Sequence, residues 1–143
     1  MLKNLNPYLN ADLLHVLRSM GHGDELILVD CNFPSDSVAA HTVSGKLIRM
    51  EGLNVPEVAE AILSVYPLDS FVPEPVLRME VVGNPDEWVE CHHEMKKVVD
   101  KTSDREWKFG SIERHAFYER ARNAYAVVLS LIHISEPTRR SDI

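Results

Sequence analysis

The sequence predicts an α/β fold, a single compact domain in which helices cover a mixed sheet. The chain has 143 residues, which is the usual size of one domain. Its residues are 45% hydrophobic and 26% charged, as in an ordinary globular protein. Short apolar runs alternate along the chain with stretches of helical periodicity, and this alternation is typical of α/β proteins.

The first two predicted elements lie near the N-terminus. Apolar residues recur at helical spacing over 13–17, after Asn10 or Asp12 as a candidate N-cap, and the pattern stops at Gly21. This spacing predicts a short helix. The apolar run 25–30 follows, and its shortness and flanking turn residues predict a buried strand covered on both faces.

The middle of the chain repeats this order. Residues 55–65 show helical periodicity, with Asn54 as the candidate N-cap and Pro56 in the first turn. The apolar run 76–82 predicts a second strand, and the Gly-Asn-Pro turn signal at 83–85 ends it.

Two more helices and a strand are predicted further on. The polar segment 85–101 carries only a sparse apolar stripe, which predicts a helix that faces solvent. Apolar residues share one face over 116–124, which predicts a helix, and 125–129 is predicted to be a strand.

The sequence pattern breaks after Val128. The run 129–139 resembles the conceptual translation of a sequencing adapter, so we expect residues 1–128 to form the domain and residues 129–143 to be a non-native tail. Such a tail would pack poorly and leave an unpaired sheet edge. A genuine polar tail is the alternative interpretation.

Charge and cysteine content limit the classes of function. The net charge of −7 disfavours nucleic acid as a partner, because that affinity depends on clustered Lys and Arg. No apolar stretch is long enough for a membrane span and no secretory leader is recognisable, so a cytoplasmic location without membrane partners is expected. Cys31 and Cys91 lack metal-binding spacing and are expected to be buried thiols.

A histidine between two glycines is the first candidate for chemistry. Gly21 and Gly23 flank His22 at the predicted helix-to-strand turn, where small neighbours let a ligand approach closely. Histidine can both donate and accept a proton near neutral pH, which suits general acid–base catalysis. A plain structural or surface role is the alternative.

Three other segments carry candidate groups. Asp30 ends the strand 25–30, where α/β sheets bind ligands, and it could accept hydrogen bonds from hydroxyl groups; a helix cap or loop anchor is the alternative. The segment 114–120 mixes charged and aromatic residues, and a charged helical face is its simpler interpretation. Residues 90–94 include two adjacent histidines, which would point to different faces of a helix, so no metal is expected.

Several short motifs follow the order in which one known family carries them. They are MGHGDE at 20–25, Asp30 with NFP at 32–34, EGL at 51–53, PLDS at 67–70, and ER followed by FYERA within 113–121. On these motifs the sequence resembles the RbsD/FucU family over residues 2–128. Family members continue past the last motif with a Tyr-Gly-Asn segment that completes the sugar site, and this chain departs from that pattern.

The resemblance implies a compact α/β fold, a cofactor-free enzyme that interconverts the anomers of a reducing sugar, and a homo-oligomer, a decamer in characterised members. It implies that His22 is the proton donor and that Asp30 contacts the sugar. Arg114 implies L-fucose as the sugar, because the ribose branch tends to have histidine there. Tyr118 could relay a proton or only pack, and Asp69 could bind sugar or cap local backbone. A ribose pyranase and a non-catalytic sugar-binding accessory of transport are the alternatives.

Overall fold

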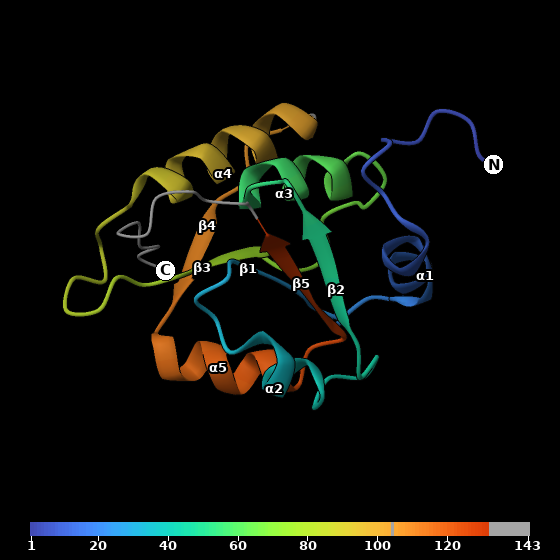
Figure 1. Cartoon of the computed structure of the whole chain (residues 1–143). Helices are drawn as coiled ribbons and strands as arrows, with labels where there is room; N and C mark the ends of the chain where they lie inside the picture. The colour runs from blue at the N-terminus through green and yellow to red at the C-terminus, as the bar shows by residue number, and fades with distance from the viewer. Residues whose placement is uncertain (104, 132–143) are drawn as a thin grey trace.

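The computed structural model describes residues 1–103 and 105–131 and shows helices alternating with strands (Figure 1). The predicted α/β class is therefore confirmed. The helices are α1 (Ala11–Ser19), α2 (Ser35–Ala39), α3 (Val55–Leu63), α4 (Glu90–Thr102) and α5 (Arg114–Arg122). The strands are β1 (Leu26–Val29), β2 (Leu47–Glu51), β3 (Val76–Met79), β4 (Phe109–Ile112) and β5 (Ala126–Leu131).

The described strands form two parallel sheets in place of the mixed sheet expected. One sheet has the order β1-β5-β2, so that β5 occupies its centre although it comes last in the chain. The other pairs β3 with β4. All of these pairings are parallel because a helix intervenes along the chain between the strands that pair.

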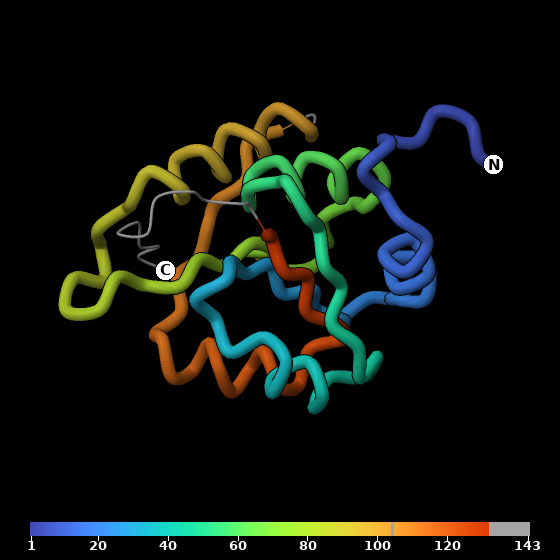
Figure 2. Tube along the Cα trace, viewed as in Figure 1, coloured from blue at the N-terminus to red at the C-terminus, as the bar shows by residue number. Residues whose placement is uncertain are grey.

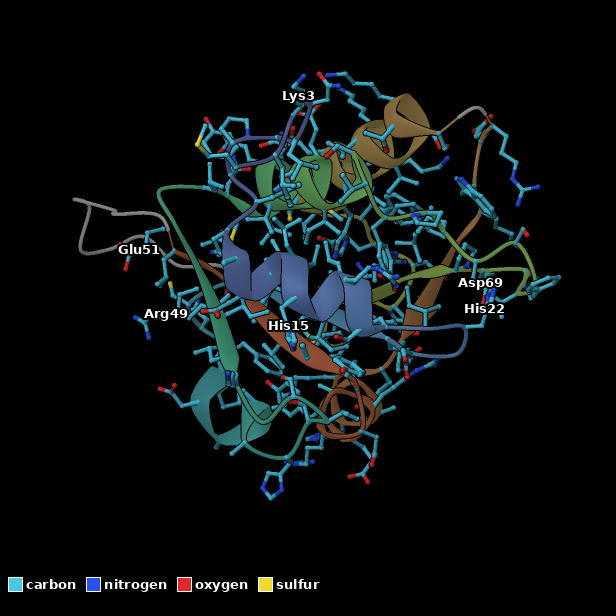
Figure 3. The ribbon with its side chains drawn as sticks, turned by 90° about the vertical axis from the view of Figure 1, so that its right-hand side faces the viewer. Lys3, His15, His22, Arg49, Glu51 and Asp69 are labelled. Atoms are coloured by element: carbon cyan, nitrogen blue, oxygen red, sulfur yellow. The ribbon has the colours of Figure 1, made fainter. Side chains whose placement is uncertain are left out.

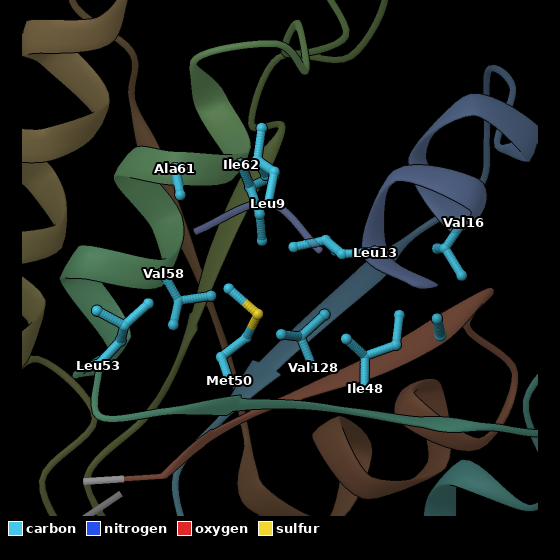
Figure 4. Packing of buried hydrophobic residues seen from close by; sticks show 11 residues of the cluster. Leu9, Leu13, Val16, Ile48, Met50, Leu53, Val58, Ala61, Ile62 and Val128 are labelled. Carbon is cyan, nitrogen blue, oxygen red and sulfur yellow. The ribbon is translucent and has the colours of Figure 1, made fainter. Parts of the chain in front are cut away.

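Helices lie on both sides of the strands. In Figures 1 and 2, α3 and α4 lie above the strands and α2 and α5 below them, with α1 at one flank. Side chains of β5 alternate between the two layers. Ala126 and Val128 join the core that α1 and α3 cover, and Val127 and Leu129 join the core that α2 and α5 cover. Figure 4 shows Val128 in the first of these cores. The strand β1 likewise contributes to both cores, as its apolar run predicts.

The two N-caps predicted from the sequence are present. The side chain of Asn10 accepts a hydrogen bond from the Leu13 N–H at 2.8 Å and begins α1. Asn54 begins α3 with a capping box: its side chain accepts from the Glu57 N–H, and the Glu57 carboxylate accepts from the Asn54 N–H. These local bonds set where both helices start, which is why sequence reasoning placed them well.

Three elements were not predicted. The helix α2 has only five residues, too few to show a helical period. The strand β4 contains Gly110 and Ser111, which are poor strand formers. The strand β2 alternates buried Ile48 and Met50 with exposed Arg49 and Glu51, and this alternation in the sequence was not used to predict it. In addition, α4 begins at Glu90, later than expected, and Val99 on it is buried, so this helix does not only face solvent.

The expectation that residues from Leu129 onward pack poorly is wrong for the described ones. Leu129 pairs with Val29 and Arg49, is 6% exposed, and lies in the core that α2 and α5 cover. The Ser130 hydroxyl donates a hydrogen bond to the Leu53 carbonyl. Hydrophobic residues at alternate positions are enough to extend a strand, whatever their origin. The rest of the expected tail, 132–143, lies outside the described residues.

Two surface properties complete the description. None of the helices in the described ranges is long and apolar enough to cross a membrane. The thiols differ from the expectation that both are buried: Cys31 is exposed and Cys91 is half-buried. The pKa of the Cys91 thiol is raised to about 11. Burial is the main cause, and the nearby carboxylates of Glu94 and Asp30 contribute less.

Candidate functional site

The glycine turn between α1 and β1 presents His22 to solvent. Gly23 has φ of +88°, a conformation that favours glycine and reverses the chain here. The Asp24 carboxylate accepts a hydrogen bond from the Gly21 N–H at 2.8 Å and closes the turn. As a result the His22 side chain is 76% exposed, in agreement with the accessibility predicted from its glycine neighbours.

Asp69 meets His22 from a distant part of the chain. His22 Nδ1 lies 3.6 Å from Asp69 Oδ2, and Figure 3 shows the two side chains together at one edge of the molecule. The other oxygen, Asp69 Oδ1, accepts a hydrogen bond from the Phe71 N–H at 2.9 Å. The Phe71 ring packs edge-on against the His22 ring, with 5.2 Å between centroids. The sequence predicted both residues as site candidates but not their contact.

Asp30 lies at the carboxyl end of β1, as predicted. Its Oδ1 accepts a hydrogen bond from the Asn32 N–H at 2.9 Å. Burial raises the pKa of this carboxyl, and the Asn32 hydrogen bond partly opposes that change. A half-buried carboxylate at this position suits recognition of hydroxyl groups, because desolvation strengthens the hydrogen bonds that it accepts.

The helix α5 carries Arg114 and Tyr118 toward the loop that follows β1. Glu113 caps this helix by accepting from the Ala116 N–H at 3.0 Å. Arg114 is the first helical residue and is exposed. Tyr118, one turn later, packs edge-on against Phe33 with 5.3 Å between ring centroids. Because Phe33 is close to Asp30 in the chain, the middle of α5 lies beside the loop that follows the carboxyl end of β1.

The predicted residues thus fall into two groups at opposite ends of β1. His22 and Asp69 lie where the strand begins, whereas Asp30 and Tyr118 lie where it ends. The first and last residues of β1 are three steps apart, which is about 10 Å at about 3.3 Å per residue. Arg114 belongs by its place on α5 with the second group.

An ion pair that the sequence analysis missed joins α5 to the start of β1. Arg120 Nε lies 2.8 Å and 2.9 Å from the two carboxylate oxygens of Glu25. This hydrogen bonding raises the pKa of Arg120. Glu25 belongs to the MGHGDE motif and Arg120 to the FYERA motif. Their presence in these two motifs was the signal in the sequence that could have identified them.

Tyr66 is a second group that sequence reasoning did not identify. Burial raises the pKa of its phenol first, and the carboxylates of Asp24, Asp69 and Glu25 raise it further. Its hydroxyl therefore stays protonated, as a donor, through neutral pH. Tyr66 also lines an open cavity of about 600 Å³. The cavity does not include the predicted site residues; its lining comprises Leu63, Ser64, Val65, Tyr66, Pro67, Leu68, Thr102, Ser103 and Trp107.

The paired histidines of α4 have structural contacts. His92 Nδ1 accepts a hydrogen bond from the Val89 N–H at 3.2 Å, and Trp88 packs against both His92 and His93. Within residues 1–103 and 105–131, no group of His, Cys, Asp and Glu side chains is arranged to hold a metal ion.

Fold and site together define a single-domain α/β protein that presents an accessible histidine beside a carboxylate. The chain belongs to the RbsD / FucU transport protein family, which it matches over residues 3–130. The family suggested by the sequence motifs is therefore confirmed.

Curated relatives carry sugar mutarotase names. An L-fucose mutarotase of Actinobacillus pleuropneumoniae serotype 5b is 36% identical over 130 residues, covering 91% of this chain and 87% of the relative. The fucose mutarotase of Homo sapiens is 37% identical over 135 residues, covering 89% and 82%. Mutarotases interconvert anomers and are carbohydrate isomerases, the enzyme class expected from the sequence.

Solved structures agree with this relationship. The fucose mutarotase of Streptococcus pneumoniae, crystallised with L-fucose, has a TM-score of 0.78 and 36% identity, covering 90% of this chain and 88% of that one. The crystal structure of protein Atu2016 has a TM-score of 0.88 and 45% identity, covering 94% of this chain and 89% of that one.

Proposed function

We propose that this protein is an L-fucose mutarotase, an isomerase that interconverts the α and β anomers without a cofactor. The observation that carries the proposal is the exposed His22 on its glycine turn, with a carboxylate 3.6 Å away. The identity to named fucose mutarotases and the likeness to a structure crystallised with L-fucose support the same substrate.

The reaction needs protons to move at two oxygens. The ring oxygen gains a proton while the anomeric hydroxyl loses one, and the C1–O5 bond breaks to leave the open aldehyde. Rotation about the C1–C2 bond and closure on the other face then give the second anomer. One positioned acid–base group contributes about 10²–10⁴-fold to such a reaction. His22 is accessible enough to serve as that group.

The remaining predicted residues have binding roles in this proposal. Asp30 accepts hydrogen bonds from sugar hydroxyls, and the guanidinium of Arg114 donates to them. Tyr118, which packs on Phe33, offers an aromatic face and a phenol that can relay a proton. Because the two groups of residues lie at opposite ends of β1, the proposal places the sugar between residues of two protomers.

A homo-oligomer, a decamer as the family resemblance implies, would complete such a site. The segment between α3 and α4 exposes large apolar side chains, with Phe71 80% exposed and Val82 67% exposed. Contiguous exposed apolar side chains can mark protein–protein contacts, and Phe71 is followed in the chain by the exposed Val72. Phe71 also touches His22, so a neighbouring copy seated there would border the acid–base group. We further propose a cytoplasmic location, with no nucleic acid or membrane partner.

Anomer exchange measured by saturation-transfer NMR tests the function. We expect the protein to accelerate exchange between the anomeric protons of L-fucose and His22→Ala to lose most of that acceleration with an unchanged circular dichroism spectrum. His15→Ala is the matched control, because His15 is exposed on α1 and Figure 3 places it apart from His22. Full exchange by His22→Ala contradicts the role of His22. Tight sugar binding without acceleration favours a transport accessory.

A further inference from the structure

Both oxygens of the Asp69 carboxylate face groups of the protein. Oδ1 accepts from the Phe71 N–H at 2.9 Å, which forms an Asx turn and fixes the carboxylate. Oδ2 faces His22 Nδ1 at 3.6 Å. The side chain is 27% exposed, so it is partly shielded from water. One oxygen of this carboxylate is thus held by the backbone, and the other is the one that faces the imidazole.

The His22 ring is held on a second side. Phe71 packs edge-on against it, with an angle of 61° between the ring planes. The Asx turn therefore orients both the carboxylate and the aromatic ring that contact His22. In an imidazole the two nitrogens point in diverging directions, so a ring with Nδ1 toward Asp69 directs Nε2 away from it.

We propose that Asp69 is a positioning residue, which keeps the proton of neutral His22 on Nδ1 and leaves Nε2 as the atom that exchanges protons with the sugar. A carboxylate accepts hydrogen bonds and cannot donate them, so it favours the tautomer with a proton on Nδ1. The inference deepens the proposed mutarotase function and rests on it for the identity of the sugar.

The separation of 3.6 Å is an electrostatic contact and is longer than a hydrogen bond. Catalytic hydrogen bonds are often long without substrate and shorten when it binds. The inference therefore includes shortening of this contact in the complex with L-fucose. Of the two roles predicted for Asp69, sugar binding and backbone capping, the inference does not include direct sugar contact.

Asp69→Asn separates the two roles with little change in shape. Its side-chain oxygen can still accept from the Phe71 N–H, but its amide group donates toward Nδ1 and favours the opposite tautomer of His22. We expect long-range ¹H–¹⁵N NMR of the sugar-free protein to show the proton on Nδ1 in the unmodified chain and on Nε2 in Asp69→Asn. We expect kcat to fall at least about 10-fold, which is less than the whole rate acceleration that a positioned base provides. We expect KM to change less than about twofold.

Two further variants keep the test decisive. Asp69→Ser retains an acceptor for the turn and removes the carboxylate, so it should lower kcat as well if Asp69→Asn folds poorly. Asp12→Asn is the matched control for loss of one charge, since Asp12 lies at the far end of α1 from the turn. An unchanged tautomer with unchanged kcat overturns the inference, and so does a raised KM with unchanged kcat. If the mutarotase proposal is wrong, the unmodified protein will not accelerate anomer exchange. The tautomer of His22, measured by NMR in the absence of sugar, then still tests the role of Asp69.

Discussion

The guanidinium of Arg120 on α5 binds the carboxylate of Glu25 at the start of β1 through both carboxylate oxygens. The backbone strengthens this junction, because the Tyr125 N–H donates to the Glu25 carbonyl at 2.9 Å. The pair thus holds the end of α5 against the turn that carries His22. The same helix carries Arg114 and Tyr118.

We expect Arg120→Lys to affect catalysis more than stability. Both side chains are partly exposed, so loss of the pair should cost only about 0–1 kcal/mol of unfolding free energy. Lysine cannot bind both oxygens in the same geometry, so the turn should shift and kcat for anomer exchange should fall by about 10-fold. Urea unfolding and exchange NMR measure the two effects. Arg122→Lys on the same helix is the control, and equal effects of both variants would contradict the argument.

The raised pKa of Asp30 predicts a pH dependence of sugar binding. Burial favours the protonated acid, so Asp30 takes up a proton at higher pH than an ordinary aspartate. Binding through its carboxylate should weaken as pH falls through that raised pKa. The KM for L-fucose should therefore rise on acidification earlier than an ordinary aspartate would allow, and Asp30→Asn should remove this dependence.

The free energy of unfolding should increase as pH falls through the pKa of Asp30, whereas sugar binding should weaken over the same range. A carboxyl whose folded pKa lies above its unfolded value destabilises the fold at neutral pH, and this penalty disappears as pH falls through the folded pKa. Asp30→Asn should accordingly unfold at a temperature equal to or above that of the unmodified chain at pH 7. A large loss of thermal stability in this variant would show that the carboxylate anchors the loop.

Arg114 should control the choice between L-fucose and D-ribose. The residue lies exposed on the first turn of α5, where substitution should leave the core unchanged. We expect Arg114→His to reduce the ratio of kcat/KM for L-fucose over D-ribose by about 10-fold, the effect of one charge-assisted hydrogen bond. Arg122→His is the control on the last turn. Faster exchange of ribose by the unmodified protein would favour the ribose pyranase alternative.

The central strand provides a test of the C-terminal boundary. Leu129 is 6% exposed and pairs with strands on both sides, so Leu129→Ala should lower the unfolding free energy by about 2–5 kcal/mol. Leu2→Ala is the control at an exposed leucine. A small effect of Leu129→Ala, measured by denaturant unfolding, would contradict the position of Leu129 in the core.

We propose that residues 132–143 are a non-native addition to the domain. A chain ending at Leu131 should then melt within about 2 °C of the full chain, less than a change of about 1 kcal/mol produces in a domain of this size. Differential scanning calorimetry measures this difference. A clear loss of stability on removal would favour a genuine tail.

Local patterns were sufficient for much of the fold. Asn10 and Asn54 begin helices through bonds to residues three positions later, and both contacts could be predicted from short sequence windows. By contrast, β2 and β4 depend on partners far along the chain, and α2 is too short to show a period. The order of the sheet, with β5 between β1 and β2, depends on long-range pairing that no local pattern encodes.

The sequence by itself determined which side chains are candidates for chemistry: a histidine between glycines, an aspartate after a strand, and an arginine at the start of a helix. Residue type, spacing and motif order can all be read along the chain without knowing its fold, and they also identify the family. Only the tertiary structure decided that Asp69 faces His22 and that Arg120 binds Glu25. The physical reason is that such contacts form between segments distant in the chain, whose mutual positions are set by packing of the two cores around β5.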